Sequence, residues 1–511
     1  MKRPALVPIQ SSLIEEEKLN LTRREFLRAT GSLPAARLAA QGSARPNVLF
    51  IVVDDLDCRI GCYGDQVAKT PNIDRLAARG VRFERAYCQY PLCNPTRSSV
   101  LSGRYPLSTG VLDNNTWLVL EPGQQILPRY FESQGYQTAE FGKIWHAQNR
   151  GHVRGEPPPR VPAPANGRAQ AWFTPEDRAA QQQREPAYWD SVHSPYRNMQ
   201  PPEPWNYAWA NVYGPLPAGD PGVDAPIADR AIASLEKMAS SGKPFFLSVG
   251  FHRPHVPLTA PAKYFDLFDA ASMPLPPDFD TEPRALPGMP RDEFRQNIDL
   301  FAARGFSAQE AREAMRAYYA CSAYMDAQLG RVLERLDALQ LRENTIVVLW
   351  GDHGWHLSEK GMWAKGTLFE TSARGPMILS DPRRAKAKSS PRVVQYIDLF
   401  PTLTDLCGLP SPPWLDGVSL RPLLDNPSAA WDRPAYTVQT RNWFIGRSVR
   451  DERWRYTEWD QGRRGSALFD HDNDPHEMRN LAADPKHAEV VRRMRELLRA
   501  PRPNGQPRPS A

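Results

Sequence analysis

The chain is predicted to fold as an α/β protein with a large mixed, mostly parallel sheet flanked by helices. A continuous apolar run, residues 47–53, is typical of a strand that is buried on both faces. Strand-like runs then alternate with helical ones along most of the chain. Charged and polar residues follow directly after several of these strands, as they do where open α/β sheets form their sites.

Each further element is indicated by its own apolar pattern. Strands are expected over residues 137–141, 244–249, 345–350 and 376–379, and helices over residues 126–133, 227–239 and 307–339. The last of these helices begins with Ser307, and Glu310 follows at the spacing of a capping box. Three short strands, over residues 435–439, 444–449 and 454–459, precede a terminal helix near residues 486–498.

The change of pattern after residue 427 indicates two domains. With 511 residues the chain is too long for one small core, so a large domain and a smaller one are expected. We assign residues 45–427 to the large domain and residues 428–511 to a C-terminal α+β subdomain with a small antiparallel sheet and the terminal helix. Residues 150–225 are rich in Pro, Gly and aromatic side chains, which favours an ordered loop region or a flexible insertion.

The N-terminal segment, residues 1–44, is interpreted as an export leader. Arg23 and Arg24 precede Phe26 and Leu27 in a pattern that resembles a twin-arginine signal. This predicts a periplasmic or secreted protein, and the alternative is a basic leader without that function. The chain has no stretch of eighteen or more apolar residues, so no membrane span is expected.

Composition narrows the classes of partner. The net charge of +6 at pH 7 favours acidic substrates only weakly on a chain of this length. No basic run with interleaved aromatic side chains is present, so nucleic acid is not expected as a partner. The six cysteines are scattered without the spacing of zinc ligands or the density of a disulfide framework.

The run Cys-Asn-Pro-Thr-Arg at residues 93–97 has a definite local chemistry. Pro95 suits the first turn of a helix, so a helix over residues 96–102 is expected, with Cys93 just before it. An anion is favoured at that position by the helix dipole and the free N–H groups. Arg97 adds a fixed cation that can hydrogen-bond a developing oxyanion. The alternative is an ordinary buried cysteine in a capped turn.

Reactive side chains follow four of the expected strands. Because the carboxyl ends of such strands share one edge of the sheet, we expect these side chains to converge on one crevice. The carboxylates form a set that suits a hard divalent cation, with Ca²⁺ as the leading candidate, although an imidazole ligand fits Zn²⁺ or Mn²⁺ equally well. The side chains are Asp54 and Asp55, Lys143 and His146, His255, and Asp352 and His353.

These motifs together resemble a known family. Cys93, Pro95 and Arg97, with Gly103 and Arg104 downstream, match the C-x-P-x-R signature of the sulfatases. Residues 46–56, 61–65, 252–257 and 352–365 are similar to the iduronate-2-sulfatase branch, which has Asp-His rather than Asp-Asn in its second metal motif. Residues 448–459 and 468–477 resemble the C-terminal subdomain of the same branch.

The resemblance implies the alkaline-phosphatase-like sulfatase fold, with residues 45–427 as the catalytic domain. It also implies that a maturation enzyme converts Cys93 to formylglycine, whose hydrated aldehyde is the nucleophile for sulfate ester cleavage. One Ca²⁺ would be held by the modified residue 93 and by Asp54, Asp55, Asp352 and His353.

The remaining roles are also implied by the resemblance. Lys143, His255 and Lys365 would balance charge on the sulfuryl oxygens, and His255 or Lys365 would protonate the leaving alcohol. His146 would act as the general base that releases sulfate, as suits an imidazole near neutral pH. Trp355 would wall the sugar site.

The expected function is hydrolysis of sulfate esters on a sulfated sugar, with a 2-O-sulfated uronic acid residue as the first hypothesis. A cation for the uronate carboxylate would come from Lys365, Arg253, His356 or the 150–225 region. Two alternatives remain open from sequence. One is a phosphonate or phosphate ester hydrolase of the same superfamily, and the other is a catalytically silent protein that binds sulfated glycans.

Overall fold

The computed structural model describes residues 45–146, 149–155, 213–294, 307–384, 387–441 and 444–499, which belong to one compact unit. The expected leader lies outside the described residues, as does most of the 150–225 region. The division of the rest at residue 427 stays a prediction. Among the described helices, none is long and apolar enough to cross a membrane.

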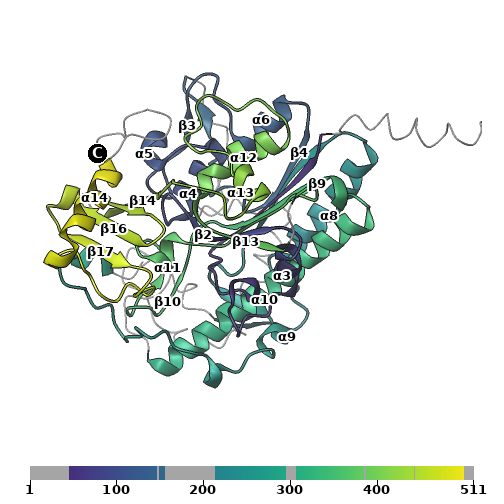
Figure 1. Ribbon diagram of the computed structural model, residues 1–511. Helices are drawn as coiled ribbons and strands as arrows, with labels where there is room; N and C mark the ends of the chain where they lie inside the picture. The colour runs from purple at the N-terminus through teal and green to yellow at the C-terminus, as the bar shows by residue number, and fades with distance from the viewer. Residues whose placement is uncertain are drawn as a thin grey trace, which may run out of the picture. The chain divides into compact units, whose positions relative to one another are not determined.

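A seven-stranded sheet forms the centre of the molecule, in the order β13-β2-β12-β9-β1-β7-β4 (Figure 1). Strand β12 runs antiparallel to both of its neighbours, and every other neighbouring pair is parallel. The mixed, mostly parallel sheet predicted from the sequence is therefore confirmed. Its strands are β1 (Asn47–Val53), β2 (Val81–Tyr87), β4 (Gln137–Gly142), β7 (Phe245–Phe251), β9 (Thr345–Gly351), β12 (Met377–Ser380) and β13 (Lys388–Gln395).

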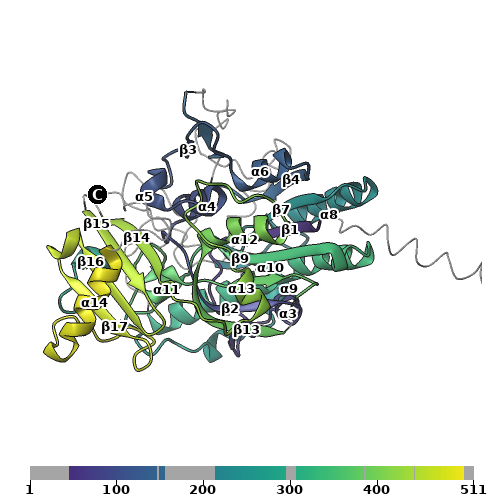
Figure 2. The ribbon, with the colours of Figure 1, turned by 45° about the horizontal axis from the view of Figure 1, so that its top comes forward.

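Strand β1 shows how the apolar run builds two cores. Because successive side chains of a strand point to opposite faces, Val48, Phe50 and Val52 enter one apolar cluster and Leu49, Ile51 and Val53 enter the other. Helices cover both faces (Figures 1 and 2). The first cluster is closed by α4 (Cys93–Ser102), α6 (Leu127–Ser133), α12 (Leu399–Leu406) and α13 (Arg421–Asp425), and the second by α3 (Pro71–Ala77), α8 (Ala225–Ser240) and α10 (Ala308–Ala338).

The helix boundaries agree with the predicted ones to within two residues, except at α4. The capping box of α10 is present, since Ser307 accepts from the backbone N–H of Glu310 and the Glu310 carboxylate accepts from that of Ser307. Helix α4 begins at Cys93, three residues earlier than predicted. Pro95 permits this because the N–H groups of the first helical turn have no acceptor inside the helix. Cys93 therefore lies in the first turn rather than before it.

Two strands of the main sheet, β2 and β13, were not predicted. The charged residues Arg82, Glu84 and Arg85 interrupt the apolar pattern of β2, and only alternate positions of that strand are fully buried at its start. Strand β13 lies at the edge of the sheet, contains Pro391 and has a register shift between Ser390 and Val393. Edge strands tolerate proline because one side of the strand makes no ladder bonds.

The predicted C-terminal sheet is present and has one more strand than expected. Its order is β14-β15-β16-β17, all antiparallel, and α14 packs against it through Met494 and Leu498. The small sheet and its helix are the yellow elements of Figure 2. Their bounds are β14 (Ala435–Arg441), β15 (Phe444–Arg450), β16 (Trp454–Trp459), β17 (Ser466–Asp470) and α14 (Ala488–Arg499).

Shorter elements connect these layers. The helices are α5 (Pro106–Thr109), α9 (Ala262–Phe265), α11 (Glu370–Ala373) and the 3₁₀ turn η4 (Arg291–Phe294). The strand pairs are β3 (Val119–Leu120) with β5 (His152–Val153), β6 (Tyr213–Leu216) with β8 (Leu258–Pro261), and β10 (His356–Leu357) with β11 (Trp363–Ala364).

Candidate active site

Backbone hydrogen bonds continue past the strand ends and hold the reactive loops side by side. The N–H of Asp54 donates to Phe251 at 3.1 Å, that of Asp352 donates to Val53 at 3.2 Å, and that of Lys143 donates to Gly250 at 2.9 Å. Gly250 is required for this approach, because a Cβ atom there would lie 2.2 Å from the carbonyl oxygen of Lys143. The loops after β1, β4, β7 and β9 therefore meet, as the sequence predicts.

Three buried carboxylates lie together at this edge. Asp54, Asp55 and Asp352 are fully buried, and Asp55 is held in a left-handed turn with φ of 59°. One oxygen of Asp352 accepts from the backbone N–H of Asp55 at 3.0 Å. The Oδ2 atom of Asp55 has no hydrogen-bond partner within the described part of the chain. A buried carboxylate oxygen in that state is costly unless a cation completes it.

Cys93 lies among these groups at the start of α4, with a side chain that is 1% exposed. Its Sγ atom is 3.4 Å from Oδ1 of Asp54 and 3.5 Å from Nε2 of His353. The ammonium of Lys365 lies 3.0 Å from the sulfur and that of Lys143 lies 3.7 Å from it. Burial, followed by the Asp54 charge, raises the pKa of the Cys93 thiol, so the unmodified cysteine would be a poor nucleophile.

Arg97 lies one helical turn after Cys93, on the same face of α4. Its guanidinium donates to Asp352 at 3.0 Å, to Asp54 at 3.0 Å and to the carbonyl oxygen of Ile144 at 3.2 Å. The oxyanion contact expected from the sequence stays a prediction. Arg97 thus fixes the orientation of the carboxylates.

Two lysines and a histidine complete the polar lining. The Lys143 ammonium pairs with Asp54, and the Lys365 ammonium pairs with Asp55. Nε2 of His255 lies 3.9 Å from the Asp54 carboxylate and 3.8 Å from that of Asp55. Burial, followed by the Lys143 charge, lowers the pKa of His255 well below its ordinary value, so this imidazole is neutral.

The charges act differently on the two neighbouring aspartates. Burial alone would raise the pKa of Asp54, but Lys143 and the other cations hold it well below its usual value. Burial raises the pKa of Asp55 to about 8 against the opposing charge of Lys365, and repulsion from Asp54 and Asp352 adds to the rise. A bound cation would therefore favour the ionised form of Asp55.

A comparison with models of known protein families shows which family this chain belongs to. The model described as Sulfatase matches residues 46–409, and the model described as N-sulphoglucosamine sulphohydrolase, C-terminal, matches residues 358–504. The chain belongs to the sulfatase family. It is therefore a sulfuric ester hydrolase, and the resemblance found in the sequence is confirmed.

Individual relatives of this sulfatase agree with the assignment. The iduronate 2-sulfatase of Mus musculus is 32% identical over 422 residues, which cover 74% of this chain and 72% of that protein. A solved structure of a 2-O GAG sulfatase has 25% identity and a TM-score of 0.65, covering 89% of this chain and 91% of that chain. The phosphonate monoester hydrolase of Agrobacterium radiobacter has 23% identity and a TM-score of 0.69, covering 89% and 95%. That last likeness shows the fold alone, and the predicted alkaline-phosphatase-like fold is confirmed.

The donor set of this sulfatase fits a divalent cation. Ligand atoms of Asp55, Cys93, Asp352 and His353 all lie within 4.8 Å of one another, and Asp54 and His255 form an overlapping group with Asp55 and Cys93. Oxygen donors dominate, as Ca²⁺ prefers. Burial lowers the pKa of His353 to about 4, which keeps its imidazole neutral and able to act as a ligand.

Other predicted residues lie close to this centre or behind it. His146 follows Lys143, and burial, followed by the charge of that lysine, lowers the pKa of His146 well below its ordinary value. Trp355 is fully buried, stacks on Tyr318 with ring centroids 6.5 Å apart and lies 5.4 Å from the Lys365 ammonium. These contacts place Trp355 beneath Lys365, and its role as a wall of the sugar site stays a prediction.

Two of the three side chains suggested for contact with a uronate carboxylate make internal contacts. Arg253 donates to the carbonyl oxygen of Thr259 at 2.7 Å and to that of His255 at 2.9 Å. His356 is fully buried, with Nε2 2.9 Å from Oγ1 of Thr367. Lys365 remains at the centre as a candidate for this contact.

Sequence reasoning missed Asp224, which holds the loop that carries His255. Its two carboxylate oxygens accept from the backbone N–H groups of His252 at 2.7 Å and Arg253 at 3.0 Å. Burial raises the pKa of Asp224 to about 6. Nothing near residue 224 in the sequence indicates this contact, because its partners lie 28 and 29 residues away.

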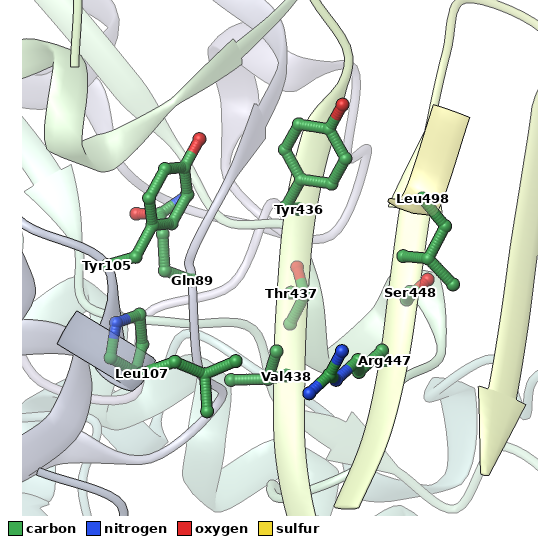
Figure 3. Close-up of a pocket in the computed structure, with 10 residues that line it drawn as sticks. Gln89, Tyr105, Leu107, Tyr436, Thr437, Val438, Arg447, Ser448 and Leu498 are labelled. Atoms are coloured by element: carbon green, nitrogen blue, oxygen red, sulfur yellow. The ribbon is translucent and has the colours of Figure 1, made fainter. Parts of the chain in front are cut away.

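A separate small cavity lies between α5 and the C-terminal sheet (Figure 3). Its volume of about 40 Å³ accommodates one or two water molecules. Tyr105 and Tyr436 meet edge to face across it, and Arg447 and Leu498 also line it. No residue of the catalytic centre lines this cavity, so it does not mark the substrate site.

Proposed function

We propose that this sulfatase hydrolyses the sulfate ester of a 2-O-sulfated uronic acid residue in a glycan, with formylglycine at position 93 and a bound Ca²⁺. One observation carries the proposal. The buried Cys93 sulfur lies beside an acidic cluster and within 3.0 and 3.7 Å of two ammonium groups, Lys365 and Lys143. A nucleophile at this position has both a cation site and countercharges for sulfuryl oxygens within reach.

Asp54, Asp55, Asp352 and His353 would hold the cation together with residue 93. When bound, Ca²⁺ would supply positive charge that polarises a sulfate oxygen. The metal is also supported by the raised pKa of Asp55, because a divalent cation replaces the proton that this carboxyl otherwise retains.

Side chains of the protein supply the nucleophile, the sulfate-binding groups, and the general acid and base. A hydrated formylglycine would offer one hydroxyl to attack sulfur and a second whose deprotonation releases sulfate. Lys143 and Lys365 bind and orient the sulfuryl oxygens. Lys365, or His255 once the negative charge of a bound sulfate ester raises its pKa, delivers a proton to the leaving alcohol. His146 accepts the proton of the second hydroxyl, and its lowered pKa keeps the imidazole in the basic form that this step needs.

Mass spectrometry of the peptide that contains residue 93, from the native host, tests the nucleophile. We expect an aldehyde without sulfur that hydrazide reagents trap. Fully active protein with only an unmodified thiol would overturn the mechanism. Exhaustive chelation should abolish turnover and Ca²⁺ should restore it, whereas full activity without a divalent metal would discard the metal site.

The uronate assignment rests on the similarity to a protein named iduronate 2-sulfatase and to one described as a 2-O GAG sulfatase. A uronate carboxylate needs a second cation or hydrogen-bond donor beside the sulfate site. We therefore expect sulfated uronides to be cleaved with a higher kcat/KM than the same sugars with the carboxyl reduced. Equal efficiency on both would leave sulfatase activity intact and assign a neutral sulfated sugar instead.

A second candidate is hydrolysis of phosphonate or phosphate esters, favoured by the fold shared with the phosphonate monoester hydrolase. Matched aryl sulfate and aryl phosphate esters, compared by kcat/KM, distinguish the two activities. We also propose that residues 1–44 direct export by the twin-arginine route and that a maturation enzyme acts on Cys93. Replacement of Arg23 and Arg24 by lysine should retain the protein inside the cell.

A further inference from the structure

The segment that carries Lys365 is held in an unusual backbone conformation. Ala364 has φ of 70° and Gly366 has φ of 88°, so the lysine lies between two left-handed residues. For alanine that conformation costs on the order of 1–3 kcal/mol and persists only where surrounding contacts determine it. The contacts that determine it here come from outside the segment.

Glu293 and Arg441 supply such contacts to the backbone that follows Lys365. The carboxylate of Glu293 is fully buried and accepts from the backbone N–H of Leu368 at 2.5 Å. The guanidinium of Arg441 donates to the carbonyl oxygen of Gly366. Together they bind the chain immediately after Lys365 at two backbone atoms.

Glu293 and Arg441 are themselves fixed to each other and to the C-terminal sheet. Nε of Arg441 donates to Oε2 of Glu293 at 3.2 Å, and the indole N–H of Trp459 donates to the same oxygen at 3.0 Å. Arg441 is the last residue of β14 and Trp459 is the last residue of β16. A buried apolar cluster that includes Leu368 and Trp459 surrounds the pair.

We propose that Arg441 and Glu293 are positioning residues for Lys365, which they act on through the backbone of residues 366–368. Through these backbone contacts the C-terminal sheet holds the Lys365 ammonium 3.0 Å from Sγ of Cys93. The inference rests on the proposed role of Lys365 in the reaction. It extends that role to two residues that touch neither the carboxylate cluster nor Cys93.

A double-mutant cycle tests the inference with an aryl sulfate as the substrate. Arg441→Gln should lower kcat/KM by about 10- to 100-fold, the loss typical of residues that orient a reactive group. In a Lys365→Ala background the same substitution should have almost no further effect, because no ammonium is left to position. Conversion at residue 93 and metal content are measured in every variant, so that only matched preparations are compared.

Two further variants keep the test decisive. Glu293→Gln preserves the shape of the side chain and should give the same dependence on Lys365 if Arg441→Gln does not fold. Arg447→Gln is the matched control, because it removes the same charge from β15. Arg447 lines the small cavity and not the Lys365 segment, so this variant should have an unchanged kcat/KM.

The outcomes separate the inference from the proposed function. Equal losses in both backgrounds, or no loss in either, would overturn the positioning role and leave Lys365 in the mechanism. A Lys365→Ala variant with unchanged kcat/KM would overturn both the role of Lys365 and the inference.

Discussion

Two buried clusters of charged side chains in this protein differ in whether every carboxylate oxygen has a hydrogen-bond partner within the described residues. The reaction-centre cluster comprises Asp54, Asp55, Asp352, Lys143 and Lys365. The α11 cluster, between α11 and the C-terminal sheet, comprises Glu370, Arg450, Arg455, His471 and Glu477.

Every carboxylate of the α11 cluster has close partners. Glu370 accepts from the hydroxyl of Tyr87 at 3.0 Å and pairs with Arg455, while Glu477 lies 2.7 Å from Arg455 and 3.1 Å from His471. Burial alone would raise the pKa of Glu370, but His471 and the neighbouring arginines hold it below its usual range. Both carboxylates of the α11 cluster are therefore paired with cationic side chains of the chain itself.

The reaction-centre cluster has the opposite property. Asp55 retains an oxygen without a hydrogen-bond partner in the described structure, and its pKa is raised to about 8. The comparison teaches that burial of charge does not by itself mark a functional site. What marks this one is a buried carboxylate oxygen that no donor of the described chain satisfies.

The largest expected effect concerns residue 93. Cys93→Ala should lower kcat on an aryl sulfate by on the order of 10⁶-fold, as loss of a nucleophile does elsewhere, while the folded state persists. Cys407→Ala is the matched control, since that cysteine is also buried but lies at the end of α12. Substantial activity in the alanine variant would show that position 93 does not react.

A substitution in the α11 cluster should lower the stability of the protein and leave its activity nearly unchanged. Glu477→Gln leaves Arg455 and His471 with less countercharge, so the free energy of unfolding in urea should fall by about 3–5 kcal/mol. The kcat of the folded protein should stay within about twofold of the original. A large loss of kcat at unchanged stability would remove the distinction between the two clusters.

A substitution in the reaction-centre cluster should instead lower kcat. Asp352→Asn should lower kcat by roughly 100- to 1000-fold and reduce the bound divalent metal measured by elemental analysis. Because Asp352 also raises the pKa of Asp55, its removal relieves repulsion in the metal-free protein. After removal of the metal by a chelator, Asp352→Asn should therefore lower the free energy of unfolding by less than Glu477→Gln does. An equal decrease would contradict the distinction between the two clusters.

The smallest effect concerns acid. Arg455 and His471 lower the pKa of Glu477 against the opposing effect of burial, so the unfolded chain binds more protons below the ordinary value of 4.5. The stability from this group is complete above pH 4.5 and is lost as the pH falls. The difference in unfolding free energy between the original protein and Glu477→Gln should shrink below that pH. A constant difference down to pH 3 would refute the assignment.

The sequence predicts those parts of the molecule that depend on local pattern. The apolar runs before Asp54 and Asp352 predict strands, and the open α/β architecture then predicts that the two residues meet. Strand β13 is missed because its polar residues and Pro391 carry no apolar pattern. Glu293 and Arg441 are missed for a different reason, since each contacts the Lys365 segment across 75 residues of sequence.

The burial of Cys93 sets an order of events in the life of the chain. A folded protein presents only 1% of this side chain to solvent, at the start of a helix with no exposed residue. The maturation enzyme proposed above would therefore have to reach Cys93 before α4 packs against the sheet. The proposed twin-arginine export carries folded proteins, so the proposed conversion would be finished in the compartment of synthesis. Any molecule that folds before conversion would keep an unmodified, inactive Cys93 thiol. The fraction of active protein would then depend on the rate of conversion relative to the rate of folding.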